Sequence, residues 1–219
     1  MSGISAKVVI LGDSGIGKTS LIQRYISGRS DIQNSTLGAV FVKLEHNFKN
    51  EHGQNFHLPI QFWDTAGQER YNALIPMYVR DADYVILTFD LTNYVSFMSL
   101  KKWIDFGRDN FKNRYFVLVG CKNDLEMNYC LSDEDIEKFR QENIPEAKFF
   151  KCSSMTGENI HELFLHVKMS LEKLGEHRIR LNSMNFKTDE KVINLDDYNE
   201  LFSGNSYVDI VGMKKKCCF

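Results

Sequence analysis

The sequence predicts an α/β domain with a mostly parallel six-stranded sheet covered by helices on both faces. Short apolar runs alternate with helix-like periodicity, a glycine-rich loop follows the first apolar run, and polar residues follow several others. At 219 residues the chain is long enough for one such domain and a tail. The expected strands are 6–11, 39–48, 55–63, 83–89, 115–121 and 148–152, and the expected helices lie near 18–28, 70–80, 95–110, 132–142 and 158–174.

The order of these elements indicates how the sheet is assembled. Lys7–Leu11 is a short apolar run suited to a buried strand, and Ser20–Ile26 spaces its apolar residues like a helix. The turn-rich stretch Asn50–Gly53 predicts an antiparallel hairpin between the second and third strands. In doubly wound sheets ligands bind at the carboxyl ends of the strands, so we expect a phosphate site there.

The loop after the first strand matches a phosphate-binding pattern. Residues 12–19 fit G-x-x-x-x-G-K-[ST] without a mismatch. Glycines let several backbone N–H groups face one anion, Lys18 would reach the β- and γ-phosphates, and the Thr19 hydroxyl would ligate Mg²⁺. The alternative is a glycine-rich turn that binds nothing. The residues expected to contact nucleotide here are Asp13, Ser14, Gly15, Ile16, Gly17, Lys18, Thr19 and Ser20.

A second chemical segment follows the expected strand 55–63. Asp64 is a carboxylate at a strand end, where it can hold a metal-bound water. Gly67 can bring a backbone N–H close to a terminal phosphate, and Gln68 can orient an attacking water without being a strong base. These are the parts that a GTP-hydrolysing switch needs, and Gln68 is the candidate catalytic residue.

A third segment is suited to recognising the base. The apolar run Phe116–Gly120 leads into Cys121-Lys122-Asn123-Asp124. A carboxylate such as Asp124 can accept from both the N1 and N2 donors of guanine, a pair that adenine lacks. Lys122 can lay its stem along the face of the base. An ordinary solvated turn is the alternative interpretation of this segment.

Together these motifs resemble those of small GTPases of the Ras superfamily, in the Rab branch, over roughly residues 5–175. The matching pieces are Gly12–Thr19, Thr36–Gly38, Trp63–Glu69, Lys122 with Asp124, and Thr156–Asn159. Rab-like pieces are Gly38–Phe41, Ile60–Trp63, Gln68–Tyr71, Tyr78–Ala82, Leu87–Thr92 and the terminal Cys217-Cys218-Phe219. Ile75-Pro76, Tyr78–Asp81 and Lys102–Asp105 look most similar to Golgi-trafficking Rabs.

The resemblance implies a P-loop NTPase fold, the G domain, over residues 1–175 and a flexible hypervariable tail over 176–219. It implies a switch that binds GTP or GDP with Mg²⁺ and hydrolyses GTP slowly without an activating protein. Thr36 would give its hydroxyl to Mg²⁺ beside Thr19 and Asp64, and its N–H to the γ-phosphate. The implied guanine contacts are Cys121, Lys122, Asp124, Ser153, Ser154 and Met155. Phe41, Trp63 and Tyr78 would form an effector patch, although a strand Trp is more often core.

The tail ends in Lys214-Lys215-Lys216-Cys217-Cys218-Phe219, which does not form a C-a-a-X box because Lys216 is fourth from the end. The paired cysteines imply geranylgeranyl groups on Cys217 and Cys218, and two lipids anchor stably where one does not. The unmodified, solvated tail is the alternative. Val192–Leu195 is a small apolar island that would dock on an escort protein or pack on the chain's own domain.

Composition narrows the remaining classes. A net charge of −2 gives no reason to expect nucleic-acid binding, and no apolar run is long enough for a transmembrane helix. The N-terminus lacks a signal-peptide core, and a disulfide framework is not expected from the five cysteines, so the chain should be cytosolic. We also expect a monomer. The resemblance adds reversible attachment to the cytosolic face of Golgi or endosomal vesicles. It also implies effectors, an exchange factor, an activating protein, an escort protein and a dissociation inhibitor as partners.

Three departures from the family pattern predict weaker nucleotide binding. Cys121 stands where the family has Asn, Met155 stands where it has Lys, and residues 28–35 lack the aromatic that covers guanine. We therefore expect unusually fast nucleotide release. Two other functions remain open: a prenylated pseudo-GTPase scaffold that binds partners regardless of nucleotide, and a P-loop ATPase or small-molecule kinase, which Asp124 disfavours.

Overall fold

The computed structural model describes residues 5–29, 39–50, 52–65, 75–110 and 115–187. The chain divides into two units, Met1–Ile179 and Arg180–Phe219. The first unit holds the sheet that was expected from the sequence. In the described part of the chain, no helix is long and apolar enough to cross a membrane.

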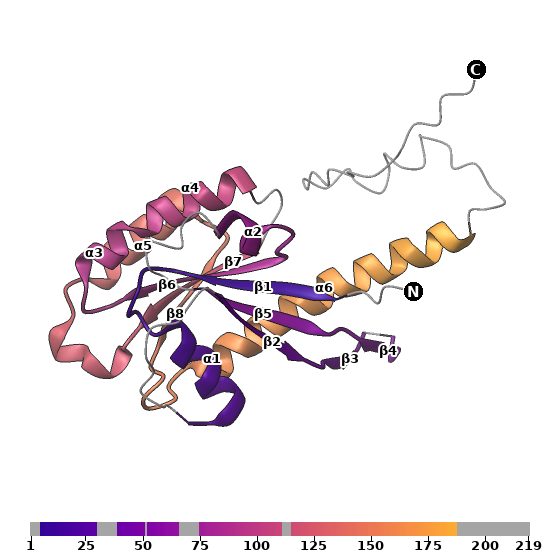
Figure 1. Cartoon of the computed structure of the whole chain (residues 1–219), viewed down its shortest axis with the longest axis horizontal. Coiled ribbons are helices and arrows are strands. Elements are labelled where there is room, and N and C mark those ends of the chain that lie inside the picture. The colour runs from indigo at the N-terminus through magenta and orange to yellow at the C-terminus, as the bar shows by residue number, and fades with distance from the viewer. Residues whose placement is uncertain (1–4, 30–38, 51, 66–74, 111–114, 188–219) are drawn as a thin grey trace, which may run out of the picture. The chain divides into compact units, whose positions relative to one another are not determined.

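A six-stranded sheet forms the centre of the first unit (Figure 1). Its strands, in spatial order, are β2 (Ala39–Leu44), β5 (Ile60–Thr65), β1 (Ala6–Leu11), β6 (Tyr84–Asp90), β7 (Tyr115–Cys121) and β8 (Lys148–Cys152). β2 pairs with β5 antiparallel, and the other neighbours pair parallel. The predicted fold class, a mostly parallel sheet of six strands, is confirmed.

The predicted hairpin is present, but each of its strands is interrupted. The expected strand 39–48 is split into β2 and β3 (Asn47–Lys49), and the expected strand 55–63 into β4 (Asn55–His57) and β5. β3 and β4 form a separate two-stranded sheet. Pro59 lies at the interruption and has no N–H to continue the ladder. The backbone N–H of Leu58 still donates to the His46 carbonyl at 2.8 Å, so the two chain segments stay paired between the six-stranded sheet and the two-stranded sheet.

Six helices connect and cover the described strands. They are α1 (Lys18–Ser27), α2 (Ile75–Val79), α3 (Tyr94–Met98), α4 (Leu100–Asn110), α5 (Asp133–Asn143) and α6 (Ile160–Lys187), with a 3₁₀ helix at Asn123–Asn128. The expected helix 95–110 is divided at Ser99, between α3 and α4. Of the expected helix 70–80 the structure describes α2, and residues 66–74 lie outside the described part.

Helix α6 continues to Lys187, past the expected helix end at 174 and the expected domain boundary at 175. The expected helix ended just before Gly175, but this glycine lies buried inside the helix. A Cβ at Gly175 would lie 2.9 Å from the Leu58 Cδ2 atom, so glycine here permits close packing on the hairpin. Close packing of the helix on Leu58, and not the end of a helix, explains the glycine at this position.

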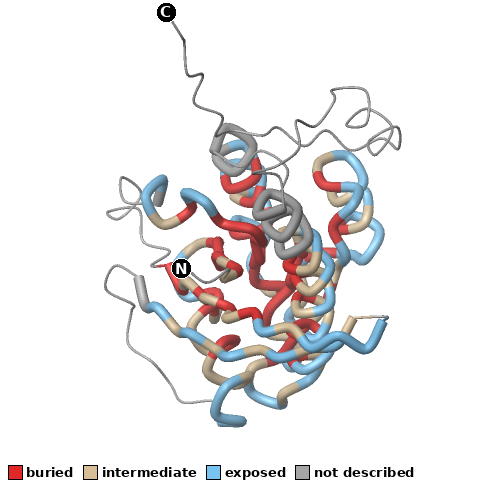
Figure 2. The backbone as a smooth tube through the Cα atoms, turned by 90° about the vertical axis from the view of Figure 1, so that its right-hand side faces the viewer, coloured by how far each residue is buried: buried red, intermediate tan, exposed pale blue. Residues whose placement is uncertain are grey.

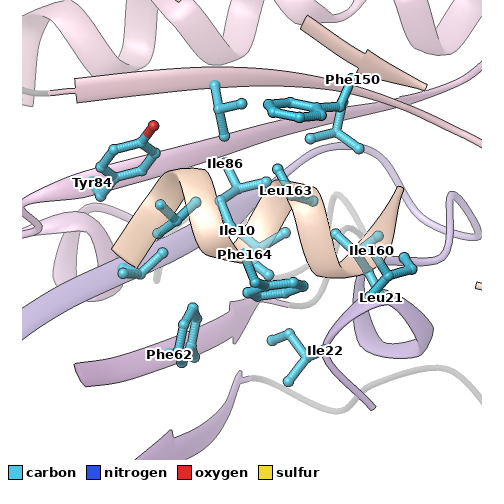
Figure 3. Close-up of a cluster of buried hydrophobic side chains, with 14 of the residues drawn as sticks. Ile10, Leu21, Ile22, Phe62, Tyr84, Ile86, Phe150, Ile160, Leu163 and Phe164 are labelled. Atoms are coloured by element: carbon cyan, nitrogen blue, oxygen red, sulfur yellow. The ribbon is translucent and has the colours of Figure 1, made fainter. Parts of the chain in front are cut away.

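Two apolar clusters pack against opposite faces of the sheet. Figure 2 shows that the buried residues lie in the interior of the domain, around the sheet. Alternation along β1 sends Val8 and Ile10 to one cluster and Val9 and Leu11 to the other. The first cluster lies under α1 and α6; its labelled side chains in Figure 3 are Ile10, Leu21, Ile22, Phe62, Tyr84, Ile86, Phe150, Ile160, Leu163 and Phe164. The second cluster includes Val79, Phe97, Leu100, Trp103, Ile104 and Ile136, from α2 to α5.

Candidate functional site

The candidate site lies at the carboxyl edge of the sheet, where parallel strands end side by side. Residues 12–17 follow β1, Asp64 is the last residue but one of β5, Asp90 ends β6, residues 122–124 follow β7 and Ser153 follows β8. Because these strands belong to one sheet, segments as far apart in the sequence as Gly12 and Ser153 lie along the same edge.

The glycine-rich loop curves as the motif predicted. Gly15 and Gly17 have φ values of 76° and 110°, in the region that favours glycine. Gly12 is needed for a different reason: a Cβ there would lie 2.4 Å from both the carbonyl oxygen and the Oγ1 of Thr88. Ile16 is buried in the first apolar cluster, whereas Ser14 and Gly15 are exposed at the rim. The loop is therefore held close to β6 and faces outward at its tip.

Lys18 lies under this loop and is 5% exposed. Its ammonium donates to the Gly12 carbonyl at 2.9 Å and to the Asp13 carbonyl at 2.7 Å. Burial lowers the pKa of Lys18 to about 8, and the nearby Asp64 carboxylate opposes that shift. The lysine thus braces the curved backbone and places a cation where phosphate oxygens would be bound.

Thr19 and Asp64 meet beside Lys18. The Thr19 hydroxyl donates to Asp64 Oδ2 at 2.5 Å. Asp64 Oδ1 is buried and accepts no hydrogen bond from the residues that the structure describes. Burial raises the pKa of the Asp64 carboxyl, while Thr19 and Lys18 act in the opposite direction. A hydroxyl and a carboxylate with an unused buried oxygen fit the hard oxygen ligands that Mg²⁺ prefers.

The expected guanine-reading residues also come together. The Ser153 hydroxyl is fully buried and donates to Asp124 Oδ1 at 2.5 Å. The backbone N–H of Thr156 in turn donates to Ser153 Oγ at 3.1 Å. Ser153 therefore orients the Asp124 carboxylate. Ser154 is half-buried beside it and Met155 is 62% exposed.

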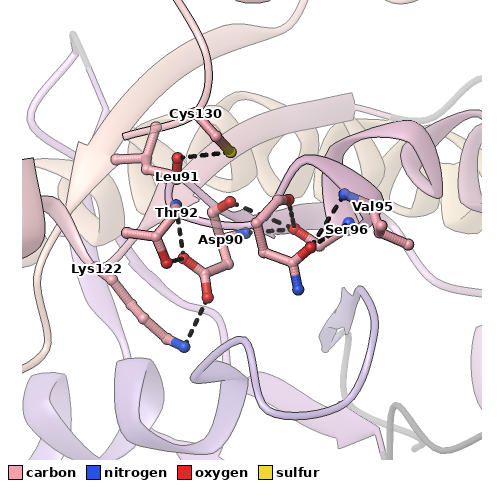
Figure 4. Close-up of polar contacts among 8 residues, drawn as sticks. Asp90, Leu91, Thr92, Val95, Ser96, Lys122 and Cys130 are labelled. Carbon is pink, nitrogen blue, oxygen red and sulfur yellow. Dashed lines mark hydrogen bonds and ion pairs between the residues drawn. The ribbon is translucent and has the colours of Figure 1, made fainter. Parts of the chain in front are cut away.

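Lys122 is held by the carboxylate of Asp90, the last residue of β6, which was not predicted as a site residue. Its ammonium lies 2.6 Å from Asp90 Oδ2, and Thr92 donates to Asp90 Oδ1 through its N–H at 2.9 Å and its hydroxyl at 2.7 Å (Figure 4). Burial opposes ionisation of Asp90, but the hydrogen bonds from Lys122 and Thr92 outweigh it and lower the pKa of this carboxyl below 3.8. Lys122 has a left-handed backbone, with φ of 64°, which turns the chain at the end of β7.

Cys121 is buried, and it lies opposite Cys152 in the register of the neighbouring strands β7 and β8. Burial raises the pKa of the Cys121 thiol to about 12. The carbonyl and side-chain oxygens of Asn123 accept from the Tyr129 hydroxyl, so this residue is held toward Tyr129. The three described cysteines, Cys121, Cys130 and Cys152, are free thiols.

Several expected site residues lie outside the described part of the chain. They are Thr36, Gly67, Gln68, Cys217 and Cys218. The structure adds Asp90 and Trp103, whose indole N–H donates to Asp13 Oδ1 at 2.9 Å. Asp90 could have been suspected as a second strand-end carboxylate, like Asp64. Nothing in the local sequence around Trp103 points to Asp13.

Phe41, Trp63 and Tyr78 form an aromatic cluster at the side of the site. The ring centroids of Phe41 and Trp63 are 5.3 Å apart, and those of Trp63 and Tyr78 are 6.1 Å apart. Phe41 is 49% exposed, while Trp63 is half-buried and packs against the second apolar cluster. Trp63 is therefore partly core and partly surface, and its role in an effector patch stays a prediction.

The fold and this edge define a P-loop nucleotide-binding domain. A model of the Ras family matches residues 7–173, and the chain belongs to that family. Among known relatives, Ras-related protein Rab-5B of Plasmodium falciparum is 42% identical over 72% of this chain and 73% of its own length. Ras-related protein RABF2b of Arabidopsis thaliana is 37% identical over 78% of this chain and 83% of its own length. GTP-binding protein ypt5 of Schizosaccharomyces pombe is 36% identical over 82% of this chain and 85% of its own length.

This membership settles the reaction class. Members of the Ras family are small GTPases, which bind guanine nucleotide and hydrolyse GTP to GDP, and the Rab-type relatives make this chain a switch in vesicle traffic. The alternative of a nucleotide-independent scaffold finds no support in these matches. The placement beside Golgi-trafficking Rabs is corrected, because the relatives named here are of the Rab5 and ypt5 type.

Proposed function

We propose that the protein is a Rab5-type GTPase that acts on endosomal membranes and selects guanine through Asp124. The observation that carries base selection is the Ser153–Asp124 hydrogen bond of 2.5 Å at the same sheet edge as the phosphate loop. A carboxylate fixed in this way accepts from two guanine donors and would be left with one partner or none by adenine. The endosomal assignment is supported by the Rab5-type relatives.

The phosphate end of the nucleotide would be held by the backbone N–H groups of residues 13–20 and by Lys18. Thr19 and Asp64 would hold Mg²⁺, with Thr36 as a third protein ligand. Bound Mg²⁺ neutralises phosphate charge during transfer of the γ-phosphoryl group. The unused Asp64 Oδ1 supports this assignment, since a buried carboxylate oxygen without a partner is costly unless something else binds it.

Gln68 would orient the attacking water, and Thr36 and Gly67 would contact the γ-phosphate through their backbone N–H groups. Loss of that phosphate would release both segments, which is the order-to-disorder form of a switch. The aromatic cluster Phe41–Trp63–Tyr78 supports a nearby effector surface, because two of its residues flank the segment that carries Gln68 in the sequence. Exchange factor, activating protein, escort protein and dissociation inhibitor are the partners that such a cycle requires.

Geranylgeranyl groups on Cys217 and Cys218 would attach the chain to the membrane, with Lys214–Lys216 adding attraction to anionic lipid. The G domain would then be followed by a membrane-tethering tail, with a boundary near 175–180. Nucleotide release would be fast, because Cys121 and Met155 provide weaker base contacts than the family's Asn and Lys.

The first test is to denature freshly purified protein and identify the released nucleotide by chromatography. We expect stoichiometric GDP or GTP in the wild type. Asp124→Asn should shift preference from guanine toward xanthine nucleotides, whereas Ser153→Ala should weaken GDP binding without creating a xanthine preference. A wild-type protein that is empty and cannot be loaded with GTP would contradict the proposal.

A second test addresses the membrane. The tagged chain should colocalise with an endosomal marker in cells, and a variant with both Cys217→Ser and Cys218→Ser should be diffuse. Colocalisation with a Golgi marker alone would overturn the endosomal assignment without affecting the nucleotide chemistry.

A further inference from the structure

Trp103 connects helix α4 to the phosphate loop. Its indole N–H donates to Asp13 Oδ1 at 2.9 Å, and the side chain is 2% exposed. The ring packs in the second apolar cluster, which also contains Leu11 at the end of β1 and Leu100 and Ile104 of the same helix. A buried indole surrounded in this way has little freedom to reorient, so its N–H is a fixed donor.

Asp13 is held from two directions. Its side chain accepts from Trp103, and its backbone carbonyl accepts from the Lys18 ammonium at 2.7 Å. The chain of contacts therefore runs from α4 through the Asp13 side chain and backbone to the lysine expected to contact the phosphates. Thr88 supports the residues just before Asp13. Its hydroxyl donates to the Leu11 carbonyl at 2.9 Å, and its atoms leave no room for a Cβ at Gly12.

The charge of Asp13 makes this tether necessary. A carboxylate in a loop that binds phosphates would repel them if it turned toward the anion. The hydrogen bond to Trp103 directs one carboxylate oxygen toward α4 instead, and it uses a charge-assisted bond that is stronger than a neutral one. The loop can then keep an acidic residue at its second position and still present its N–H groups to an anion.

We propose that Trp103 is a positioning residue for the phosphate loop. Its indole N–H holds the Asp13 side chain, and Asp13 in turn maintains the curvature of the loop and the position of the Lys18 ammonium. The residue acts through Asp13 and touches no phosphate itself. This inference rests on the proposed binding of guanine nucleotide at the loop and adds a residue 90 positions away in the sequence.

The test is a double-mutant cycle read by release of fluorescent mant-GDP in excess Mg²⁺, with the label excited directly rather than through tryptophan. Trp103→Phe keeps an aromatic ring but loses the donor, and Asp13→Ala loses the acceptor. Each should speed release about tenfold, as expected when a hydrogen bond to a charged group is lost. The double variant should release no faster than either single variant, because the two changes remove one interaction.

Two further variants separate positioning from packing. Asp13→Asn keeps an acceptor oxygen and should release mant-GDP more slowly than Asp13→Ala. Lys102→Ala removes the ammonium that lies 5.2 Å from the Trp103 ring centroid but leaves the indole N–H intact, so its release rate should match that of the wild type. Urea unfolding of all variants reports any general loss of stability.

Effects of Trp103→Phe and Asp13→Ala that multiply in the double variant would overturn the proposal and assign the Trp103 effect to packing alone. Release from Trp103→Phe at the wild-type rate would also overturn it. These outcomes differ from failure of the proposed function, which would appear as a wild-type protein that cannot be loaded with mant-GDP at all.

Discussion

The Lys7 ammonium lies 4.6 Å from the centroid of the Trp63 ring and donates to the Arg80 carbonyl at 2.7 Å. The backbone of Lys7 is fixed too, because its N–H donates to Asp83 Oδ2 at 2.8 Å. A charged side chain of β1 thus lies against the aromatic cluster Phe41–Trp63–Tyr78. The position of Trp63 within the proposed effector surface depends on a strand that also leads into the phosphate loop.

Replacing Lys7 by Met should lower the free energy of unfolding by about 1 kcal/mol, since a cation–π contact and a hydrogen bond from the charged group are lost while the aliphatic stem stays. Urea unfolding measures the change. Lys148→Met is the control: its ammonium lies 4.8 Å from the Phe150 centroid on an exposed side chain, so its loss should be smaller. Equal losses in the two variants would contradict a special role for Lys7.

Asp64→Asn should abolish the effect of Mg²⁺ on nucleotide release. In the wild type, adding EDTA should speed GDP release. In Asp64→Asn release should be fast with or without EDTA, because a neutral amide oxygen binds Mg²⁺ more weakly than a carboxylate. Asp83→Asn removes another buried carboxylate, distant from the loop, and should keep the EDTA effect. An Asp64→Asn variant that still responds to EDTA would exclude Asp64 from the Mg²⁺ site.

Asp90→Asn should lower the free energy of unfolding near neutral pH by about 1–2 kcal/mol, because the bond from the Lys122 ammonium loses its charged acceptor. The folded pKa of Asp90 is below the ordinary value of 3.8, so its ionised form stabilises the fold above that value and this stabilisation is lost as the pH falls through the folded pKa. Urea unfolding from about pH 3 to pH 7 should show the difference shrink in acid. A difference independent of pH would disprove the assignment to charge.

The described thiols should differ strongly in reactivity. Cys130 is exposed, whereas burial raises the pKa of Cys121 to about 12 and raises that of Cys152 as well. In the folded protein at mildly alkaline pH, iodoacetamide should label the Cys130 peptide at least about tenfold faster than the peptides of the two buried thiols, by mass spectrometry. Denaturation should equalise them. Rapid labelling of folded Cys121 would contradict this prediction and show that its thiol is accessible.

Much of the fold and of the site was predictable because its signals are local. The glycine spacing of residues 12–17, the strand-end carboxylate Asp64 and the apolar run before Cys121 each identify their element and their chemistry. The interruption of the hairpin was harder to predict from the sequence. Pro59 is present there, but a proline at a strand edge is also compatible with continued pairing. The expected helix end near 174 was wrong, and Gly175 could not correct it, because a glycine that ends a helix and one that admits a neighbour look the same in sequence.

Contacts that depend on tertiary packing could not be predicted. Trp103 and Asp13 are 90 positions apart, and only the packing of α4 against β6, which is the neighbour of β1 in the sheet, brings them together. The same holds for Lys122 and Asp90, which meet because β6 and β7 are neighbours in register. The Ser153–Asp124 contact likewise depends on the pairing of β7 with β8.

The separate β3–β4 sheet has a practical consequence. Its tip, around Asn50 and Gly53, lies beyond the amino end of β5, whereas Asp64 and the nucleotide loops lie at the carboxyl end of that strand. A short epitope or a fluorescent protein could therefore be inserted between His52 and Gly53 with little disturbance of the chemistry. Such an internal fusion would leave Cys217 and Cys218 without an adjacent tag, so their proposed lipidation could be followed in living cells.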